Sequence, residues 1–400
     1  MTASLSVRRE TTATRFFVGV GLGLLPAVAF GVLGLLFLRN TYESASHEDI
    51  VATQVEKGGI YGSALRDDFF EYKVALFRAT KPRIVSIGSS RAWGIQQRGF
   101  REPFVSLGGP VRSVKDGERL LASMRAEHHM PEVVLFAIDY WWFNDAWNPD
   151  DKRSSYKEEV EDVLGKPFRP AMWLYTAKVG VRDFVDVSLH ASQVPAPLPP
   201  AYGVLARYSL HGFAPDGHYS YLGDAFGLIA PDKHFDQAVA QIRKGTSRYV
   251  FGRHASQERV ERFRALVRGF EAAGARVITY IPPVSSVVRA EIARQGEKLA
   301  YVQETLEALH REQLAAYDFH DPTSIGGTDC EFIDGYHGGE VLNLRIVRAI
   351  ASDPRSRLAD HVDLPAIDQA IAHASGHVLV DGDRYAPYKE VDFLDLRCPK

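Results

Sequence analysis

Short, nearly continuous apolar runs alternate with segments of helical periodicity over most of the chain. The runs within 83–88, 104–108 and 132–139 contain β-branched residues, and the first two close on glycine. The segment 114–128 instead repeats its apolar residues at the spacing of an amphipathic helix. Uninterrupted apolar strands separated by helices are typical of a parallel sheet covered on both faces. We therefore predict a doubly wound, mainly parallel α/β fold.

The same alternation returns in the last third of the chain. Ser256 and Gly274 flank a helical pattern over 256–273, as helix start and stop signals do. The predicted strands are 83–88, 104–108, 132–139, 276–281 and 314–319, and the predicted helices are 67–78, 114–128, 256–273, 287–310 and 339–352. Together these elements define a domain over 81–355.

Three stretches of the chain do not follow this alternation of strands and helices. Residues 39–80 are predicted to form a polar stalk and a leading helix, and 356–400 a C-terminal extension that no pattern places. Residues 144–256, which are rich in proline and aromatic side chains, are predicted to be a large insertion. Such folds bind ligands at the carboxyl edge of the sheet, so an insertion above that edge is expected to form a lid or substrate wall.

An uncharged apolar run from Phe16 to Leu38 covers 23 residues near the N-terminus. A helix rising about 1.5 Å per residue extends roughly 34 Å over that run, enough to cross a bilayer core of about 30 Å. Arginines precede the run and acidic residues follow it, so 1–15 is expected in the cytoplasm and the domain outside. We predict a single-pass anchor (16–38) in the cytoplasmic membrane and a periplasmic domain.

Two alternatives to an anchor are a cleaved signal peptide and a buried core helix. The segment 27–29 resembles a small-residue cleavage site, but cleavage there would leave the apolar residues 30–38 at the new N-terminus. A core helix is disfavoured because the run contains no polar residue over its whole length.

Charge and cysteine content limit the partners and the compartment. The net charge of -3 at pH 7 carries no signature of nucleic-acid binding, which needs a clustered basic surface. The two cysteines, Cys330 and Cys398, either form one disulfide in an oxidising compartment or are separate buried thiols.

A serine follows the first predicted strand at its carboxyl end. The run 83–88 leads directly into Ser89, Ser90 and Arg91. Backbone N–H groups at such a position point toward whatever the hydroxyl reacts with, although a serine hydroxyl is a weak nucleophile until a base takes its proton. Ser90 is therefore a candidate nucleophile if a histidine lies beside it, and otherwise belongs to an ordinary turn.

A carboxylate and a histidine occur three residues apart near the C-terminus. Asp334 and His337 lie in a glycine-rich segment before the predicted helix 339–352. Aspartate can fix the imidazole tautomer and stabilise its cation while histidine acts as the base. The pair could also bind a metal ion, but no third and fourth ligand stand at convincing spacing. We expect no cofactor.

Taken together, these motifs resemble those of the SGNH/GDSL hydrolases. A serine follows the first strand, a glycine the second and a polar residue the third, and Asp-x-x-His precedes the last helix. The resemblance covers roughly 80–355, in particular to the membrane-anchored branch associated with cell-surface polysaccharide or teichoic-acid modification. It implies a flavodoxin-like fold with Ser90 as nucleophile, Gly108 as the second-block glycine, and Asp334 and His337 as the other triad members.

The third block departs from the family pattern. Where the resemblance implies an oxyanion-binding Asn, this chain has Asp139. An ionised carboxylate cannot donate a hydrogen bond to a developing oxyanion and would repel it. Asp139 is therefore expected to face a substrate hydroxyl or Arg91. The oxyanion would then be bound by the N–H groups of Ser90 and Gly108, or by the amide of Asn144.

The leading expectation is acyl chemistry on an exported glycan through an acyl-Ser90 intermediate, as an O-acyltransferase or an esterase. The expected partners are the membrane, a polysaccharide substrate and a membrane protein that donates the acyl group. The aromatic residues Trp141, Trp142 and Trp147 are expected either to stack on sugar rings or to pack the insertion on the sheet. Two rival hypotheses are an inactive glycan-binding or scaffolding protein and a metal-dependent hydrolase built on the same Asp–His pair.

Overall fold

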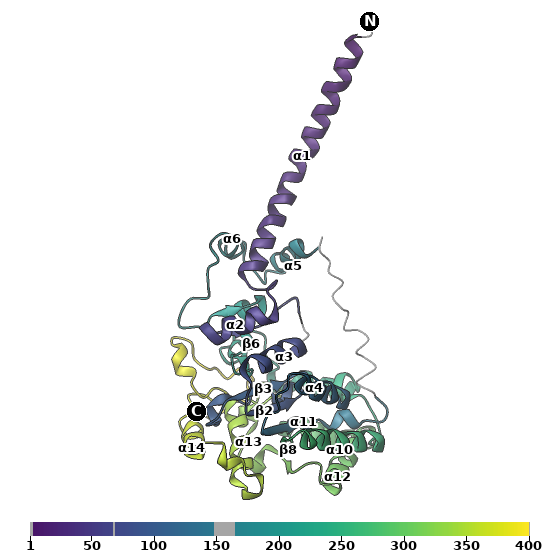
Figure 1. Ribbon diagram of the computed structural model, residues 1–400, viewed down its shortest axis with the longest axis vertical. Coiled ribbons are helices and arrows are strands. Elements are labelled where there is room, and N and C mark those ends of the chain that lie inside the picture. Colours follow the sequence, from purple (N-terminus) through teal and green to yellow (C-terminus); the bar gives the residue numbers. More distant parts are fainter. Residues whose placement is uncertain (1–2, 67–68, 148–164, 400) are drawn as a thin grey trace. The chain divides into compact units, whose positions relative to one another are not determined.

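The structure is a computed structural model that describes residues 3–66, 69–147 and 165–399 (Figure 1). Its contacts divide the chain into two compact units. The smaller comprises residues up to Ala45 together with Lys157–Val194, and the larger comprises Ser46–Tyr156 and Pro195–Lys400.

The central sheet of the larger unit has five parallel strands in the order β3-β2-β4-β8-β9. They are β2 (Ile84–Gly88), β3 (Phe104–Gly108), β4 (Val133–Ala137), β8 (Arg276–Ile281) and β9 (Tyr317–Asp318). Every residue of β2, β3 and β4 is buried, as uninterrupted apolar runs predict. This strand order is that of a flavodoxin-like doubly wound sheet, which binds ligands where the winding reverses, between β2 and β4.

Helices cover both faces of this sheet. On β4, Phe136 packs against the rings of Phe263 and Phe270, whereas Leu135 shares a core cluster with Leu344 and Val347. Adjacent strand residues point to opposite faces, so the two sets of contacts identify two helical layers. The helices are α4 (Val114–Ala126) and α10 (Gln257–Ala272) on the Phe136 face, and α13 (Glu340–Ser352) and α14 (Leu364–Ala372) on the other. The predicted α/β class with a parallel sheet is confirmed.

Helix signals in the sequence are mostly reliable, with one exception. The Ser256 hydroxyl accepts a hydrogen bond from the N–H of Arg259 at 3.4 Å and caps α10, and Gly274 follows that helix with φ 98°. The predicted helical segment 287–310 is helical but is interrupted after residue 295. The structure has α11 (Ser286–Gln295), a short 3-10 turn and α12 (Ala300–Arg311). Gly296 ends α11 with φ 51°, a conformation that glycine adopts at little cost.

The prediction of a polar stalk before the leading helix is wrong. The leading helix is α3 (Phe69–Thr80), while the two predicted helical positions before it lie outside the described residues. Ahead of them lie α2 (His47–Lys57) and β1 (Ile60–Tyr61), and β1 belongs to a second sheet of order β5-β1-β6-β7. The buried side chain of Gln54 donates to the Phe213 carbonyl at 2.7 Å and accepts from the Tyr72 hydroxyl at 2.8 Å. These long-range contacts fold the predicted stalk from Ser46 onward into the larger unit, whereas its residues 39–45 belong to the smaller unit.

Residues between β4 and α10 include the stretch 144–256 that was predicted as an insertion. To the larger unit this stretch contributes β5 (Ala201–Tyr202), α7 (Val204–Ser209), β6 (His211–Phe213), β7 (Tyr219–Tyr221), α8 (Leu222–Ala225) and α9 (Asp236–Lys244). To the smaller unit it contributes α5 (Arg169–Tyr175) and α6 (Val181–His190). Its residues 148–164 lie outside the described part.

The smaller unit is built around α1 (Ala3–Asn40). Residues Gly23–Asn40 of α1 are long and apolar enough to cross a bilayer, and only 22% of them are buried. That low burial argues against the alternative of a core helix. A helix capable of spanning a membrane is therefore present, as predicted, whereas its orientation stays a prediction.

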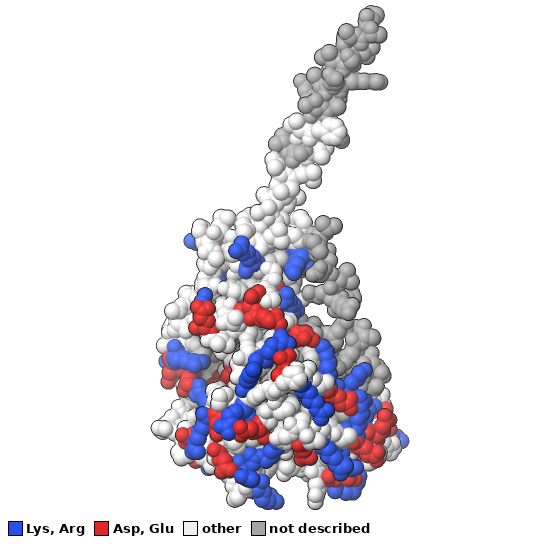
Figure 2. All heavy atoms as spheres, viewed as in Figure 1, with Lys and Arg blue, Asp and Glu red and all other residues white. Residues whose placement is uncertain are grey.

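Charged side chains on the visible face of the larger unit are interspersed in sign (Figure 2). Neither the basic nor the acidic side chains gather into one continuous patch on that face. This distribution agrees with the absence of a nucleic-acid signature in the net charge.

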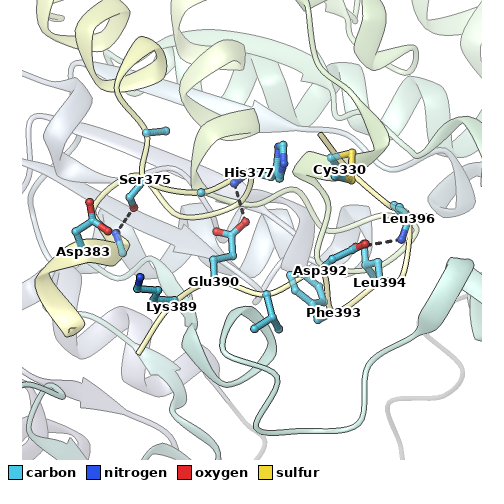
Figure 3. A pocket seen from close by; sticks show the side chains of 15 residues that line it. Cys330, Ser375, His377, Asp383, Lys389, Glu390, Asp392, Phe393, Leu394 and Leu396 are labelled. Atoms are coloured by element: carbon cyan, nitrogen blue, oxygen red, sulfur yellow. Dashed lines mark hydrogen bonds between the residues drawn. A yellow bond between two sulfur atoms is a disulfide. The ribbon is translucent and has the colours of Figure 1, made fainter. Parts of the chain in front are cut away.

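A disulfide joins the C-terminal tail to the loop before α13. Cys330 and Cys398 are bonded with Cα atoms 6.0 Å apart, which decides between the two alternatives left open by the sequence. Beside the disulfide lies a cavity of about 390 Å³ (Figure 3). One wall is the Glu390 carboxylate, which accepts backbone N–H bonds from residues 377–379. The extension 356–400 is thus folded onto the larger unit, and α14 places Ile367 in its core.

Candidate active site

A sharp turn after β2 places Ser90 at the carboxyl edge of the sheet. Gly88 ends the strand with φ 147°, and a Cβ atom there would lie 2.8 Å from the Cβ of Ala137, so glycine is required. Ser90–Ala92 then form one 3-10 turn, capped by the Ser89 hydroxyl, which accepts from the Arg91 N–H at 3.3 Å. Ser90 begins this turn, and its N–H therefore has no acceptor within it.

The loop between β9 and α13 holds Asp334 and His337 in a fixed conformation. The Ile333 N–H donates to the His337 carbonyl at 2.8 Å. One carboxylate oxygen of Asp334 accepts the N–H groups of Tyr336 and His337 at 3.0 and 2.8 Å. Asn343, on α13, donates its amide to the carbonyls of residues 338 and 339, both at 2.9 Å. The orientation of the imidazole is therefore set mainly by backbone hydrogen bonds.

The structure brings Ser90, His337 and Asp334 into one hydrogen-bonded chain. The His337 Nδ1 atom lies 2.7 Å from Asp334 Oδ2, and Nε2 lies 2.7 Å from Ser90 Oγ. Both distances fall within the reach of about 2.6–3.2 Å expected of a nucleophile, its base and the group that orients the base. The predicted proximity of these three side chains is thus observed across 247 residues of sequence.

Electrostatics keep the Asp334 carboxylate ionised. Burial alone would raise its pKa, but the His337 imidazole and the two backbone N–H groups outweigh burial and hold the pKa below its ordinary value. An ionised Asp334 requires a proton on His337 Nδ1, which leaves Nε2 free to accept the Ser90 proton.

Arg91 and Asp139 contact each other, which confirms the alternative that Asp139 faces Arg91 and contradicts a substrate-binding role for either residue. Arg91 Nη1 lies 3.0 Å from Asp139 Oδ1, and the two side chains are 0% and 1% exposed. Arg91 also donates to the carbonyls of Pro282 and Pro283 beyond β8. Burial raises the pKa of Asp139, while the Arg91 charge opposes that rise. The pair therefore joins the turn after β2 to the ends of β4 and β8 from inside the protein.

Asn144 is likewise not an oxyanion donor. Its amide nitrogen donates to the Val250 carbonyl at 2.7 Å, and its oxygen accepts the Ala146 N–H at 3.0 Å. The residue is fully buried. The prediction that its amide contacts an oxyanion is therefore wrong, because the side chain fixes the chain after the third strand instead.

Gly108 supports the nucleophile turn through its lack of a side chain. It pairs with Gly88 in the sheet, and a Cβ atom on it would lie 2.8 Å from the backbone carbonyl carbon of Ala92. The next N–H, that of Gly109, is already bonded to the carbonyls of Gly88 and Ser89 at 2.9 and 3.0 Å. The Gly109 N–H is therefore not available to an oxyanion, and donor roles for the Ser90 and Gly108 N–H groups stay predictions.

An aromatic wall, which the sequence analysis missed, lies beside the imidazole. The Trp93 ring stacks on His337 (5.9 Å between centroids, 9° between planes) and on Tyr219 (4.4 Å, 20°). Tyr221 and Tyr336 approach His337 to 6.1 and 4.5 Å. Two signals were available: Trp93 follows the serine by three residues, and alternate strand positions place Tyr219 and Tyr221 on one face of β7.

Trp141 and Trp142, which follow β4, pack inside the protein, whereas Trp147 is half-buried and its role stays a prediction. Trp142 is 0% exposed and Trp141 is 5% exposed, and the Trp142 ring lies against Phe136 and Phe263. Their packing role is therefore observed rather than a sugar-stacking one. Arg248 is another residue missed by sequence, with its guanidinium carbon 3.6 Å from the Tyr336 ring centroid and 5.2 Å from that of Trp141.

A second Asp–His pair lies elsewhere in the larger unit. Asp216 Oδ1 is 2.5 Å from His218 Nδ1, and Asp216 Oδ2 accepts the Gln97 N–H at 2.8 Å. Burial would raise the pKa of Asp216, but the His218 imidazole and the backbone N–H groups of Gln97 and His218 lower it to about 2. Close by, the fully buried Lys73 donates to the carbonyls of Ser106 and Gly217. The Asp216–His218 pair therefore stabilises the packing of the segments around β3.

Within the described part of the chain, no group of three His, Cys, Asp or Glu side chains is placed to hold a metal ion. Comparisons with known proteins add no relative: no family model, no curated protein and no solved structure matches the chain.

Proposed function

We propose that this chain is a membrane-anchored serine enzyme of SGNH type that transfers or hydrolyses acyl groups on a glycan outside the cytoplasm. The observation that carries the proposal is the chain of two 2.7 Å contacts from Asp334 through His337 to Ser90 Oγ. The order of the motifs and the strand order of the sheet support the SGNH assignment.

The reaction proceeds in two half-reactions at Ser90. The Ser90 Oγ atom attacks the acyl carbonyl carbon while His337 Nε2 takes the hydroxyl proton and Asp334 stabilises the imidazolium. The tetrahedral intermediate then expels the donor's leaving group, which takes the proton from His337, and acyl-Ser90 remains. Water or a sugar hydroxyl next attacks acyl-Ser90 while His337 Nε2 takes its proton. The second tetrahedral intermediate expels Ser90 Oγ, which takes that proton back from His337, and the acyl group leaves as an acid or a sugar ester.

The Ser90 N–H stabilises the oxyanion in this mechanism. Losing one donor of such a hole typically costs about 10²–10³ in rate. With Asp139 paired to Arg91, no side chain at the third-block position supplies a donor. We therefore propose a slower enzyme than one with the family's Asn.

Two features support a glycan substrate outside the cytoplasm. The wall of Trp93, Tyr219 and Tyr221 lies beside the reacting groups, and aromatic rings suit the apolar faces of sugars. The Cys330–Cys398 disulfide suits an oxidising compartment, which agrees with export of the larger unit behind α1. A cytoplasmic N-terminus and a membrane acyl donor belong to the same proposal.

A second candidate is an inactive glycan-binding or scaffolding protein. The observation that favours it is the buried Arg91–Asp139 pair, which occupies the place where an oxyanion donor is expected.

A fluorophosphonate probe distinguishes the two. The probe phosphonylates an activated serine oxygen with loss of fluoride, so the native protein is expected to be labelled at Ser90, as identified by peptide mass spectrometry. The variant Ser90→Ala should not be labelled, whereas Ser352→Ala, at an exposed serine of α13, should be labelled like the native protein. A folded native protein without label on Ser90 would exclude the enzyme and leave the binding protein. Labelling and turnover that resist EDTA would exclude a metal-dependent hydrolase.

A further inference from the structure

Exposed apolar side chains concentrate on one segment of the smaller unit. Apart from α1, six of the nine exposed large apolar side chains among the described residues lie between 168 and 189. They are Phe168, Met172, Tyr175, Val181, Val185 and Leu189. Exposed apolar residues that occur singly are normal on soluble proteins, but six within one short segment indicate an interaction surface.

The opposite side of this segment packs on α1. The Phe184 ring lies 5.6 Å from that of Phe30 and 5.1 Å from that of Phe37. Gly34 allows close contact, because a Cβ atom there would lie 1.9 Å from the Pro167 carbonyl oxygen. Small residues at such positions let helices in membranes approach their neighbours.

Hydrogen bonds add to this packing. The Asn40 amide donates to the carbonyls of Val187 and Ser188 at 2.9 and 3.1 Å, and the Ser188 hydroxyl donates to the Leu33 carbonyl at 3.1 Å. The segment is therefore held along the C-terminal part of α1.

The contacts with α1 set the depth of the segment. Phe168 stacks on Phe30 with 6.1 Å between ring centroids. Phe30 lies eight residues before Leu38, where the apolar run ends, and hence about 12 Å back along the helix axis at about 1.5 Å per residue. If α1 spans the bilayer, a segment packed at Phe30 lies within the outer leaflet.

The face pattern of α6 fits this location. At about 100° per residue, Val181, Val185 and Leu189 form one stripe, and the residues packed on α1 form the adjoining stripe. Together these stripes cover roughly 200° of the helix, while the charged residues Arg182 and Asp186 lie on the remaining arc. Because α1 covers only one of the two stripes, a second apolar partner must cover the other.

We propose that residues 165–190 are embedded in the outer leaflet of the membrane that α1 crosses, with lipid chains covering their free apolar face. The proposal rests on membrane insertion of α1, which is part of the proposed function. The segment carries Lys166, Arg169, Lys178 and Arg182 against Asp183 and Asp186, a net charge of 4 − 2 = +2. In Figure 2 this region is mainly white with separated blue groups. Such a surface suits anionic lipid headgroups.

The test places a fluorescent probe at single cysteines in the full chain, reconstituted in vesicles of phosphatidylcholine and phosphatidylglycerol. The native cysteines are disulfide-bonded and do not compete for a maleimide. The test variants are Tyr175→Cys and Leu189→Cys, which replace side chains that are 89% and 58% exposed. Val28→Cys, in α1, is the inserted control, and Glu258→Cys, on the exposed face of α10, is the aqueous control.

We expect doxyl lipids labelled near the headgroup to quench the probe at 175 and 189 and not at 258. Lipids labelled deep in the chain should quench the probe at 28. Quenching at 28 without quenching at 175 and 189 would overturn the proposal and leave the anchor intact. A blue-shifted but unquenched probe at 189 would also overturn it, because a second copy of the chain would then cover the face. An unquenched probe at 28 would instead refute the anchor itself. Met172→Cys replaces any test variant that does not accumulate.

Discussion

Two of the aspartate–histidine pairs in the larger unit, Asp334–His337 and Asp216–His218, differ in what the second imidazole nitrogen contacts. In both pairs the carboxylate accepts hydrogen bonds from the imidazole Nδ1 and from backbone N–H groups. His337 Nε2 lies 2.7 Å from the Ser90 hydroxyl, whereas His218 makes no such contact with a hydroxyl among the described residues. The spare oxygen of Asp216 binds the Gln97 N–H. An Asp–His pair therefore identifies a catalytic site only when a nucleophile completes it.

The largest expected effect separates the two histidines. His337→Gln should lower kcat by roughly 10⁴-fold or more, because the base is lost, while the fold is retained. His218→Gln, the matched control, should lower the melting temperature and change kcat only a few-fold. Initial rates on a chromogenic acyl ester, measured beside thermal unfolding, check both. Equal losses of kcat in the two variants would contradict the contrast.

A third buried carboxylate sharpens the comparison, since Asp139 pairs with Arg91 instead of histidine. Asp139→Asn introduces the residue implied by the SGNH resemblance, but it leaves the buried guanidinium without its counter-charge. We expect a loss of about 3 kcal/mol in the free energy of unfolding and no gain in kcat. Urea unfolding measures the first and ester turnover the second, with the exposed Asp383→Asn as control. A faster and equally stable variant would show that position 139 serves the oxyanion after all.

The Asp216–His218 pair predicts that the free energy of unfolding depends on pH. The folded-state pKa of Asp216 is about 2, below its ordinary value. Its contribution is therefore fully present above about pH 4 and is lost as the pH falls toward 2, in total about 2 kcal/mol. Asp216→Asn should flatten the stability profile in that range, as measured by urea unfolding at several pH values. Asp334 shifts in the same direction, so a residual slope is expected, and an unchanged slope would argue against the assignment.

The smallest expected effect concerns Trp93, whose ring stacks on His337. Among the described residues, His218 has no such aromatic neighbour. Trp93→Leu removes the stacking on His337 and should reduce kcat/KM on a glycan ester roughly 2- to 10-fold, in line with the energy of one aromatic contact. The effect on a small ester lacking sugar should be weaker, because the proposed sugar contact is then missing. Identical losses on both substrates would assign Trp93 to positioning the imidazole alone.

Local signals in the sequence were enough to locate the main sheet and the triad candidates. Ser90 follows an apolar strand, and the Asp334-x-x-His337 spacing lets one loop join both groups. For Asp139 the sequence left two alternatives, Arg91 and a substrate hydroxyl, and the fold decides for Arg91. The orientation of Asn144 was not predictable, because its partner, the Val250 carbonyl, lies far away in sequence.

Small elements were missed for a related reason. Strand β1 has two residues, too few to show a period, and it exists through pairing with β5 and β6. The break at Gly296 was missed because the apolar pattern continues on both sides of it.

The separation of 247 residues between Ser90 and His337 has a consequence for the chain before it folds. An unfolded chain leaves Ser90 without a base, and its hydroxyl is then no more reactive than that of any other serine. In the proposed enzyme, chemistry at Ser90 therefore begins only after the loop before α13 has docked on the sheet. The newly made polypeptide is then unreactive, and folding alone, without any cleavage, produces the reactive site.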